Sequence, residues 1–335
     1  MLKPSVVFRA DGHASMGLGH LLRSAALAEM LTGPFACYLA YRYCPDSLLQ
    51  QLSGQFAGIQ RLACVEPGEE SQELVRYARS VPTGNTPPIV ILDGYHFNTD
   101  YQRTITLAGL PLVCIDDIYA YHFVADIVIN HAGGVQASQY SAEPYTKFLL
   151  GPQYALLRAP FRDGKVARRD PEPKEIFVCL GGADPPNATL DVVQQIVTIF
   201  PEYTTQVVVG AAYCHMESLS TFVGNCSSTV KVHHGIDAAT MASLMSGTQY
   251  GITSPSTVSF EYLSVGGILY LLPIADNQTA IYRYYTSEGL AFSFETDFPV
   301  EDNVRLARSY TNRAALFDGK IQQRYREAFA TLISP

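Results

Sequence analysis

The chain alternates between short apolar runs and longer segments in which apolar residues recur every three to four positions. Short runs rich in Val, Ile and Leu predict strands buried on both faces, and the periodic segments predict amphipathic helices. Because the two kinds of segment alternate throughout, we predict an α/β protein with parallel sheets covered by helices. Strands are expected at 4–9, 36–41, 59–64, 88–93, 111–116, 126–130, 175–180, 205–210, 229–233, 248–252 and 268–272. Helices are expected at 19–31, 70–80, 99–108, 188–199, 237–246, 257–265 and 277–287.

One polar, proline-bearing interval, 161–174, interrupts the alternation, and its composition is typical of a linker. A chain of 335 residues is long enough for two domains with a core each. We therefore predict a Rossmann-like N-terminal domain over 1–160 and a Rossmann-like C-terminal domain over 161–335, whose last helix can pack back on the first domain. Two such domains facing each other would leave a ligand cleft between the C-terminal ends of their strands.

Composition narrows the function classes. A net charge of −8 without a basic stripe disfavours a nucleic-acid partner and an anionic membrane surface. No apolar stretch is long enough to span a bilayer, and the N-terminus enters a strand directly without the pattern of a secretory signal. Seven scattered cysteines without a CxxC pair indicate free thiols in a reducing compartment. We expect a cytoplasmic protein with no stable membrane insertion and no obligatory protein partner.

The segment between the first strand and the first helix is the most informative one. It contains Gly12, Gly17 and Gly19 and ends at His20, where the helix should begin. Glycine lets the backbone approach a ligand and a helix start offers N–H groups to an anion, so Gly17 and Gly19 are predicted to contact substrate. His20 can exchange a proton near neutral pH, which suits a catalytic base. The alternative for His20 is a helix-start residue that bonds its own backbone.

Charged residues at other strand ends are candidates for the same site. Arg23 shares a helix face with His20, where it could hold a negative substrate. Arg9 ends the first strand and is either a ligand group or a partner in a core ion pair. Asp93 and Asp117 follow two further strands. Either aspartate could orient His20, bond sugar hydroxyls or only cap a loop.

The second half contains corresponding polar corners. Gly181 and Gly182 follow its first strand and are predicted to face a diphosphate, whereas Asp184 is expected to cap the next helix. Glu261 lies one turn inside a later helix and is either a partner of the helix dipole or an acceptor for both ribose hydroxyls. The hydroxyl residues that lead into this helix and are expected to hold phosphates are Ser254, Ser256 and Thr257.

The histidines do not indicate a metal site. His13 and His20 do not share a helical face, and His233 and His234 are neighbours on a strand, where adjacent side chains point to opposite sides. We therefore expect neither a metal ion nor a cofactor.

In their order and spacing these motifs resemble the GT-B superfamily. Within it they are similar to the UDP-2,4-diacetamido-2,4,6-trideoxy-β-L-altropyranose hydrolases of pseudaminic acid biosynthesis, relatives of the MurG glycosyltransferases. The resemblance covers most of the chain and implies two Rossmann-like domains facing each other across a cleft. It also implies metal-independent hydrolysis of a UDP-linked acetamido deoxysugar at C1, with inversion. The motifs that carry it are 9–12, 17–20 with Arg23, 93–95, 116–117, Asp126 with Asn130, 150–158, 181–184, Glu261 and 277–278.

The resemblance implies a role for individual residues. His20 matches the family's general base for water, and Glu261 matches its ribose-binding glutamate. Tyr95 and Asn277 match residues that line the sugar. Nucleotide and diphosphate contacts are implied for Gly181, Gly182, the loop 254–257 and Gln278.

The chain departs from this family at positions expected on the sugar side. Gly94 stands where the family often has a polar residue, and the run 131–134 replaces small polar residues and an asparagine. Pro255, Phe260 and Tyr262 stand where the family has smaller residues.

Two other functions stay open. A GT-B glycosyltransferase would use the same nucleotide site with an acceptor in place of water, and a binding protein would have lost turnover. The chain has no amphipathic basic segment for a lipid acceptor, which disfavours the transferase, and it retains His20, which disfavours the binding protein.

The leaving group bears on the number of catalytic residues. The last ionisation of UDP has a pKa of about 6, so UDP can leave without a strong general acid. One base would then suffice where glycosidases need two carboxylates.

Overall fold

The computed structural model describes residues 2–13, 17–64, 67–162, 174–300, 302–314 and 316–333. The chain divides into two compact units. Unit 1 comprises Met1–Gly12, His20–Leu156 and Lys320–Pro335, and unit 2 comprises His13–Gly19 and Leu157–Gly319. The boundary therefore follows Leu156 rather than residue 160, and residues 13–19 group with unit 2 instead of the N-terminal domain in which we expected them. Most of the predicted linker, residues 163–173, lies outside the described residues.

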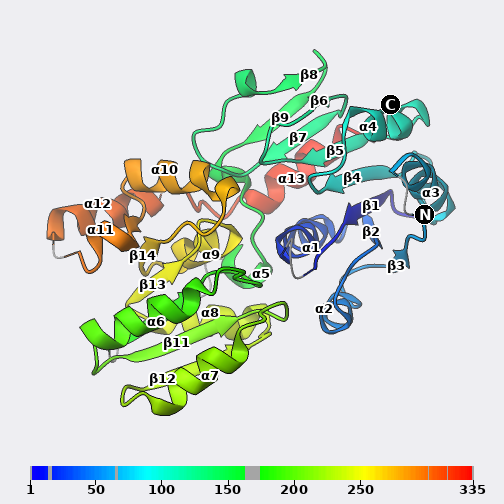
Figure 1. The fold of residues 1–335 in the computed structure, drawn as a ribbon. Helices are drawn as coiled ribbons and strands as arrows, with labels where there is room; N and C mark the ends of the chain where they lie inside the picture. Colours follow the sequence, from blue (N-terminus) through cyan, green and yellow to red (C-terminus); the bar gives the residue numbers. More distant parts are fainter. Residues whose placement is uncertain are drawn as a thin grey trace. The chain divides into compact units, whose positions relative to one another are not determined.

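Unit 1 is built on a parallel sheet whose first strand lies in the middle (Figure 1). The order reverses between β1 and β4, which is the topological switch point of a Rossmann sheet. Both strands are buried along their whole length, as expected where helices cover both faces. In spatial order the strands are β3 (Gly58–Arg61), β2 (Ala36–Tyr41), β1 (Ser5–Ala10), β4 (Ile89–Asp93), β5 (Leu112–Ile115), β7 (Ile127–Asn130) and β9 (Lys147–Leu150).

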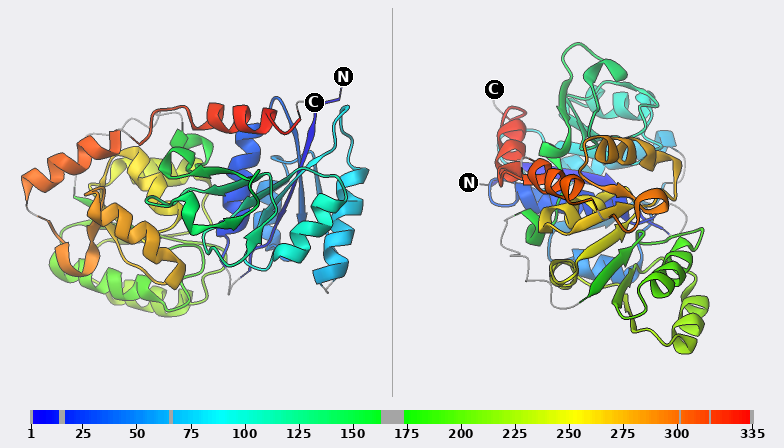
Figure 2. Two further views of the ribbon diagram at one scale, coloured as in Figure 1. Left: turned by 90° about the horizontal axis from the view of Figure 1, so that it is seen from above. Right: turned by 90° about the vertical axis from the view of Figure 1, so that its left-hand side faces the viewer.

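The last helix, α13 (Ile321–Ala330), belongs to unit 1 and lies against α1 (Gly19–Leu31) (Figure 2). Gln322 and Arg326 donate hydrogen bonds to the carbonyl of Met30, and Arg326 also donates to that of Thr32. These bonds satisfy carbonyl groups that a helix leaves open at its C-terminal end. The other helices of unit 1 are α2 (Asp46–Leu52), α3 (Pro67–Ser80), α4 (Thr99–Leu107) and the 3₁₀ turns Ala137–Gln139 and Pro152–Tyr154.

Unit 2 repeats this topology, with the order reversing between β10 and β13. In spatial order its parallel strands are β12 (Val230–His234), β11 (Thr204–Val209), β10 (Glu175–Cys179), β13 (Tyr250–Thr253), β14 (Ile268–Leu271) and β15 (Phe292–Ser293). Its helices are α5 (Ala159–Arg162), α6 (Ala188–Ile199), α7 (Met216–Asn225), α8 (Ala238–Gly247), α9 (Thr257–Val265), α10 (Thr279–Ser287), α11 (Phe294–Asp297) and α12 (Asn303–Ala314), with a 3₁₀ turn at Asp276–Gln278.

Two bulky residues that we expected near the sugar lie instead in the core of unit 2. Phe260 and Tyr262 are both 0% exposed. The Tyr262 ring occupies the space beside Gly251 and Gly267, where a Cβ at either position would lie under 3.0 Å from it. The Tyr262 side chain is therefore accommodated by the two glycines, which have no side chains. The sequence of the segment 254–263 gives no sign of this packing.

The predicted strands and helices are all present, and the helices predicted at 188–199 and 257–265 have those bounds in the structure. The prediction at 277–287 is corrected at its start, because a 3₁₀ turn precedes α10. Besides the 3₁₀ turns, the elements that the pattern did not predict are mostly short: β6 (His122–Phe123), β8 (Ser141–Ala142), β9, β15, α2, α5, α7, α11 and the longer α12.

Candidate functional site

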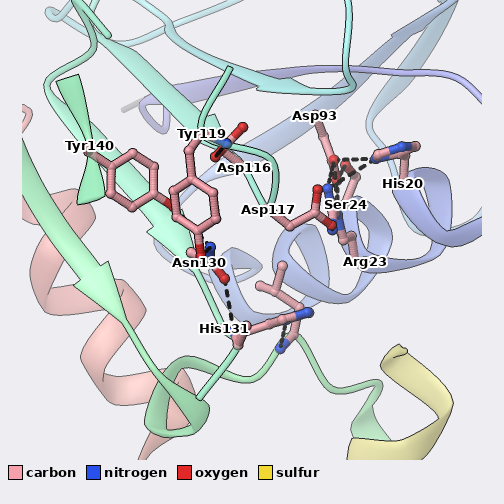
Figure 3. A network of polar contacts seen from close by, with 12 residues as sticks. His20, Arg23, Ser24, Asp93, Asp116, Asp117, Tyr119, Asn130, His131 and Tyr140 are labelled. Carbon is pink, nitrogen blue, oxygen red and sulfur yellow. Dashed lines mark hydrogen bonds and ion pairs between the residues drawn. The ribbon is translucent and has the colours of Figure 1, made fainter. Parts of the chain in front are cut away.

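The switch point of unit 1 brings His20, in the first turn of α1, to Asp93, the last residue of β4 (Figure 3). Nδ1 of His20 lies 2.7 Å from Oδ1 of Asp93, and both residues are buried. An ionised carboxylate only accepts, so a contact this short places the proton on Nδ1, which donates it to Asp93. Nη2 of Arg23 also lies 3.0 Å from Nδ1, but it is itself a donor and makes no hydrogen bond with a protonated Nδ1. Among the described residues, both of these polar approaches to the ring are at Nδ1, which leaves Nε2 to take up a proton.

A buried arginine, Arg23, joins Asp93 to a second carboxylate. Its Nη2 donates to Asp93 at 2.6 Å and its Nη1 donates to Asp117 at 2.9 Å. The hydroxyl of Ser24 also donates to Asp93, at 3.0 Å. The charge of Arg23 is therefore balanced by two side chains of unit 1, in contrast to our expectation that it holds a negative substrate.

These contacts determine the ionisation of Asp93. Burial opposes its ionisation, but the Arg23 charge and the hydrogen bonds from Arg23 and His20 outweigh burial and lower the pKa of Asp93 to about 2. A buried anion at Nδ1 orients the imidazole and stabilises the imidazolium that forms when Nε2 accepts a proton. Of the two aspartates considered as partners of His20, the structure thus selects Asp93. The arrangement suits a general base.

Two further side chains border this pair. The ring of Tyr95 lies edge-on to that of His20, with 4.7 Å between ring centroids. His131, which follows β7, is buried, and burial, aided by the Arg23 charge, lowers its pKa to about 4. His131 is therefore neutral at physiological pH, and its Nδ1 accepts from the backbone N–H of Leu156 at 3.4 Å. The sequence marked His131 only as a departure from a family pattern.

Asn130, the last residue of β7, holds neighbouring loops through its side chain (Figure 3). Its Nδ2 donates to the hydroxyls of Tyr119 and Tyr140, at 3.2 and 2.9 Å, and its Oδ1 accepts from the N–H of Ala132. Asp116 accepts from the N–H of Tyr119. The polar row along this sheet edge is therefore cross-linked internally.

Arg9, which is fully buried, lies in a separate ion-pair network. Its Nε donates to Glu70 at 2.8 Å and its Nη2 donates to Asp11 at 2.7 Å, while its guanidinium lies over the ring of Phe97. Arg42 also pairs with Glu70, at 2.9 Å. Of the two roles considered for Arg9, the core ion pair accounts for these contacts, and we no longer count Arg9 among substrate-binding residues.

In unit 2 the predicted nucleotide residues flank the switch point. Gly181 follows β10 with φ +106°, a left-handed conformation that favours glycine, and a Cβ there would lie 3.8 Å from Oγ of Ser254, which follows β13. A Cβ built on Gly182 would lie 3.6 Å from the side chain of Leu18. Leu18 lies between Gly17 and Gly19 in the chain. This segment therefore lies next to Gly182, and both belong to unit 2.

The two helix starts at this edge differ in how their N–H groups are satisfied. Asp184 accepts from the N–H groups of Ala188 and Thr189, which confirms its predicted role as a cap of α6. The side chain of Ser256, at the start of α9, makes no such cap and instead contacts the hydroxyl of Ser254 at 3.0 Å. At the start of α9, the N-cap side chain is therefore engaged with Ser254 rather than with the N–H groups of the helix.

Glu261 of α9 makes an ion pair that the sequence did not predict. Arg158 donates to its two carboxylate oxygens, at 2.6 and 2.7 Å. Burial opposes the charge of Arg158, but Glu261 outweighs burial and raises the pKa of the guanidinium. The pairing fixes the orientation of the Glu261 carboxylate, which suits an acceptor of ribose hydroxyls.

Asn277 and Gln278 lie in the 3₁₀ turn before α10. Asn277 is exposed, and Oε1 of Gln278 accepts from the N–H of Ile274 at 2.8 Å, so Gln278 stabilises its own loop.

No part of the described chain gathers three His, Cys, Asp or Glu side chains in an arrangement for a metal ion. The described helices include none long and apolar enough to cross a bilayer.

No family model matches the chain. It is 25% identical over 267 residues to an uncharacterized protein of Methanocaldococcus jannaschii, covering 76% of this chain but only 53%, about half, of that protein. It is 24% identical over 301 residues to the UDP-2,4-diacetamido-2,4,6-trideoxy-beta-L-altropyranose hydrolase of Campylobacter jejuni, covering 87% and 99% of the two chains. It is also 25% identical over 326 residues to the spore coat polysaccharide biosynthesis protein SpsG of Bacillus subtilis, covering 92% and 91%.

Solved structures establish the fold. CalG4, the calicheamicin glycosyltransferase, matches 99% of this chain and 98% of its own at a TM-score of 0.64 and 12% identity. MurG of Acinetobacter baumannii matches 98% of this chain and 99% of its own at a TM-score of 0.56 and 15% identity. This chain has the GT-B fold. The units described above are the two Rossmann-like domains of that GT-B fold.

Proposed function

We propose that this protein is an enzyme that cleaves the bond between C1 and the diphosphate of a nucleotide-linked sugar, with water as the acceptor. The observation that carries the proposal is the buried 2.7 Å contact between Nδ1 of His20 and Asp93, which leaves Nε2 as a base. The similarity to the Campylobacter jejuni hydrolase, which extends over 87% of this chain, supports the same reaction.

In the proposed step, Nε2 of His20 takes a proton from water as the water oxygen attacks C1. The bond from C1 to the phosphate oxygen breaks, and its electron pair leaves with the nucleoside diphosphate. Attack opposite to the leaving group inverts the anomeric centre. Asp93 stabilises the imidazolium through Nδ1, and Tyr95, beside the imidazole, is proposed to line the sugar.

We propose that unit 2 binds the nucleotide. The start of α9, with Ser254, Ser256 and Thr257, is assigned to the phosphates because the side chain of its N-cap residue, Ser256, makes no cap hydrogen bond. Gly181 and Gly182 are assigned to the diphosphate, and Glu261 to the ribose hydroxyls. Backbone amides and a helix start take up the charge of the leaving group, so a strong general acid is not needed.

A UDP-linked acetamido deoxysugar is the substrate that we propose, by analogy with the Campylobacter jejuni relative. The second candidate is transfer of the sugar to an acceptor other than water. It is favoured by the solved neighbours, since CalG4 and other proteins of this fold are glycosyltransferases by their names.

Incubation with a panel of UDP-sugars, with and without acceptor alcohols, separates the two functions. The products are monitored by ¹H NMR. Without any acceptor, we expect UDP and free sugar in equal amounts, and we expect the inverted anomer of the sugar to appear first. UDP release that requires an acceptor would decide for a transferase, and UDP-sugar binding without release in either condition would reject an enzymatic function.

A further inference from the structure

We propose that Asp117, acting through Arg23, is a positioning residue that sets the basicity of His20. The inference deepens the proposed function and rests on it for the role of His20 as a base. Asp117 itself makes no contact with His20 in the described structure. Its Oδ2 accepts from Nη1 of Arg23 at 2.9 Å, while Nη2 of the same guanidinium lies 3.0 Å from Nδ1 of His20.

The charges of the cluster give the first step. Asp93 and Asp117 carry two negative charges and Arg23 carries one positive charge, so the cluster has a net charge of −1 when His20 is neutral. Side-chain exposure is 0% for Asp93, 7% for Arg23 and 20% for Asp117, so solvent screens these charges only weakly. Protonation of His20 brings the cluster to neutrality.

Removal of the Asp117 charge reverses this balance. Arg23 and a protonated His20 would then share a single carboxylate, Asp93, with two cations at hydrogen-bond distance from each other. Like charges this close disfavour the protonated form of His20. Asp117 thus offsets the guanidinium charge and leaves Asp93 available to the imidazolium.

The other groups around His20 do not replace Asp117. Tyr95 lies edge-on to the ring, and His131 feels the charges of Arg23 and Asp117 but is itself neutral at physiological pH. In the described part of unit 1, the charged and titratable side chains that interact with His20 or with Arg23 are Asp93, Tyr95, Asp116, Asp117, His131 and Tyr325.

The test is the Asp117→Asn variant, which keeps an oxygen for Arg23 but removes the charge. We expect the acid limb of the pH–rate profile for UDP release to move down by about one pH unit, with a plateau rate about tenfold lower. Asp100→Asn is the matched control, because it removes the same charge from an 86% exposed side chain in unit 1. Its profile should coincide with that of the unchanged protein.

A second readout needs no turnover. The titration midpoint of the His20 ring, followed by NMR with ¹³C at Cε1 and identified by its absence in His20→Gln, should move down by a similar amount in Asp117→Asn. The inference would be overturned if Asp117→Asn lost rate at all pH values, or lost thermal stability, while the acid limb of its pH–rate profile and the NMR midpoint of His20 both stayed in place. If no UDP-sugar is cleaved but the NMR midpoint moves, the proposed function fails and the coupling through Arg23 stands.

Discussion

Arg158 donates hydrogen bonds of 2.6 and 2.7 Å to the two carboxylate oxygens of Glu261, which lies 103 residues further along the chain. Each carboxylate oxygen has more than one lone pair, so both remain able to accept a ribose hydroxyl. The ion pair fixes the plane of the carboxylate before a nucleotide binds, and preorganisation of this kind reduces the entropic cost of binding. Of the two roles considered for Glu261, we therefore propose the buried, oriented acceptor.

Removal of this acceptor should weaken nucleotide binding. Glu261→Ala deletes two charge-assisted hydrogen bonds to the ribose, each of which contributes about 1.5–3 kcal/mol when the acceptor is charged. We expect UDP affinity, measured by calorimetry, to fall by at least about tenfold. Glu295→Ala, at an exposed glutamate of unit 2, should leave affinity unchanged. Equal UDP affinity in Glu261→Ala and the unchanged protein would remove Glu261 from the proposed ribose site.

The core around Tyr262 should not accept a side chain at position 251. In Gly251→Ala the new Cβ would overlap the buried Tyr262 ring, and overpacking of this kind costs about 1–3 kcal/mol or more. The free energy of unfolding in urea should fall accordingly. Gly224→Ala is the control, because this helical glycine has no neighbour within 4 Å of a new Cβ. That variant should be neutral or more stable by about 0.5–1 kcal/mol. Equal stability of the two variants would contradict this packing.

His131 should make stability depend on pH in the weakly acidic range. Burial lowers its pKa to about 4, whereas an unfolded histidine titrates at 6.5, so the unfolded chain binds the proton first as pH falls. The stability contribution is complete above pH 6.5 and is lost as pH falls toward 4, by up to about 3 kcal/mol.

The measurement for this prediction is urea unfolding at pH 7 and pH 5. The difference between the two pH values should be smaller in His131→Gln than in the unchanged protein. His234→Gln, at an exposed histidine, should keep the full difference. An undiminished pH dependence in His131→Gln would show that His131 does not carry the effect.

The fold was predictable because its main elements are long and apolar. The helix at 188–199 shows a helical period of apolar residues, and the strands at 36–41 and 89–93 are apolar runs in the sequence. The edge strand β9 contains only Lys147–Leu150, which is too short a run to produce a clear local pattern. Neither local pattern nor composition reports that residues 13–19 group with unit 2.

The candidate site was predictable only in part, because its contacts join distant residues. The sequence places His20 at a helix start and Asp93 at a strand end, but their pairing spans 73 residues, and Asp117 was an equal candidate partner. Arg9 illustrates the opposite outcome, since Glu70, 61 residues away, places it in a buried network. Arg158 lies in the motif 150–158, and its partner Glu261 is 103 residues away, so the sequence gives no local sign of their contact.

The central claim is that His20 is the base for cleavage, and the most direct measurement compares the rate of UDP release with UDP affinity in His20→Gln. Loss of a general base lowers the rate by about 10²- to 10⁴-fold. We therefore expect at least a hundredfold loss of kcat with UDP affinity within about twofold of the unchanged protein, because unit 2 is proposed to hold the nucleotide. An unchanged kcat in His20→Gln, or a loss of UDP affinity that accounts for the whole decline in activity, would contradict the claim.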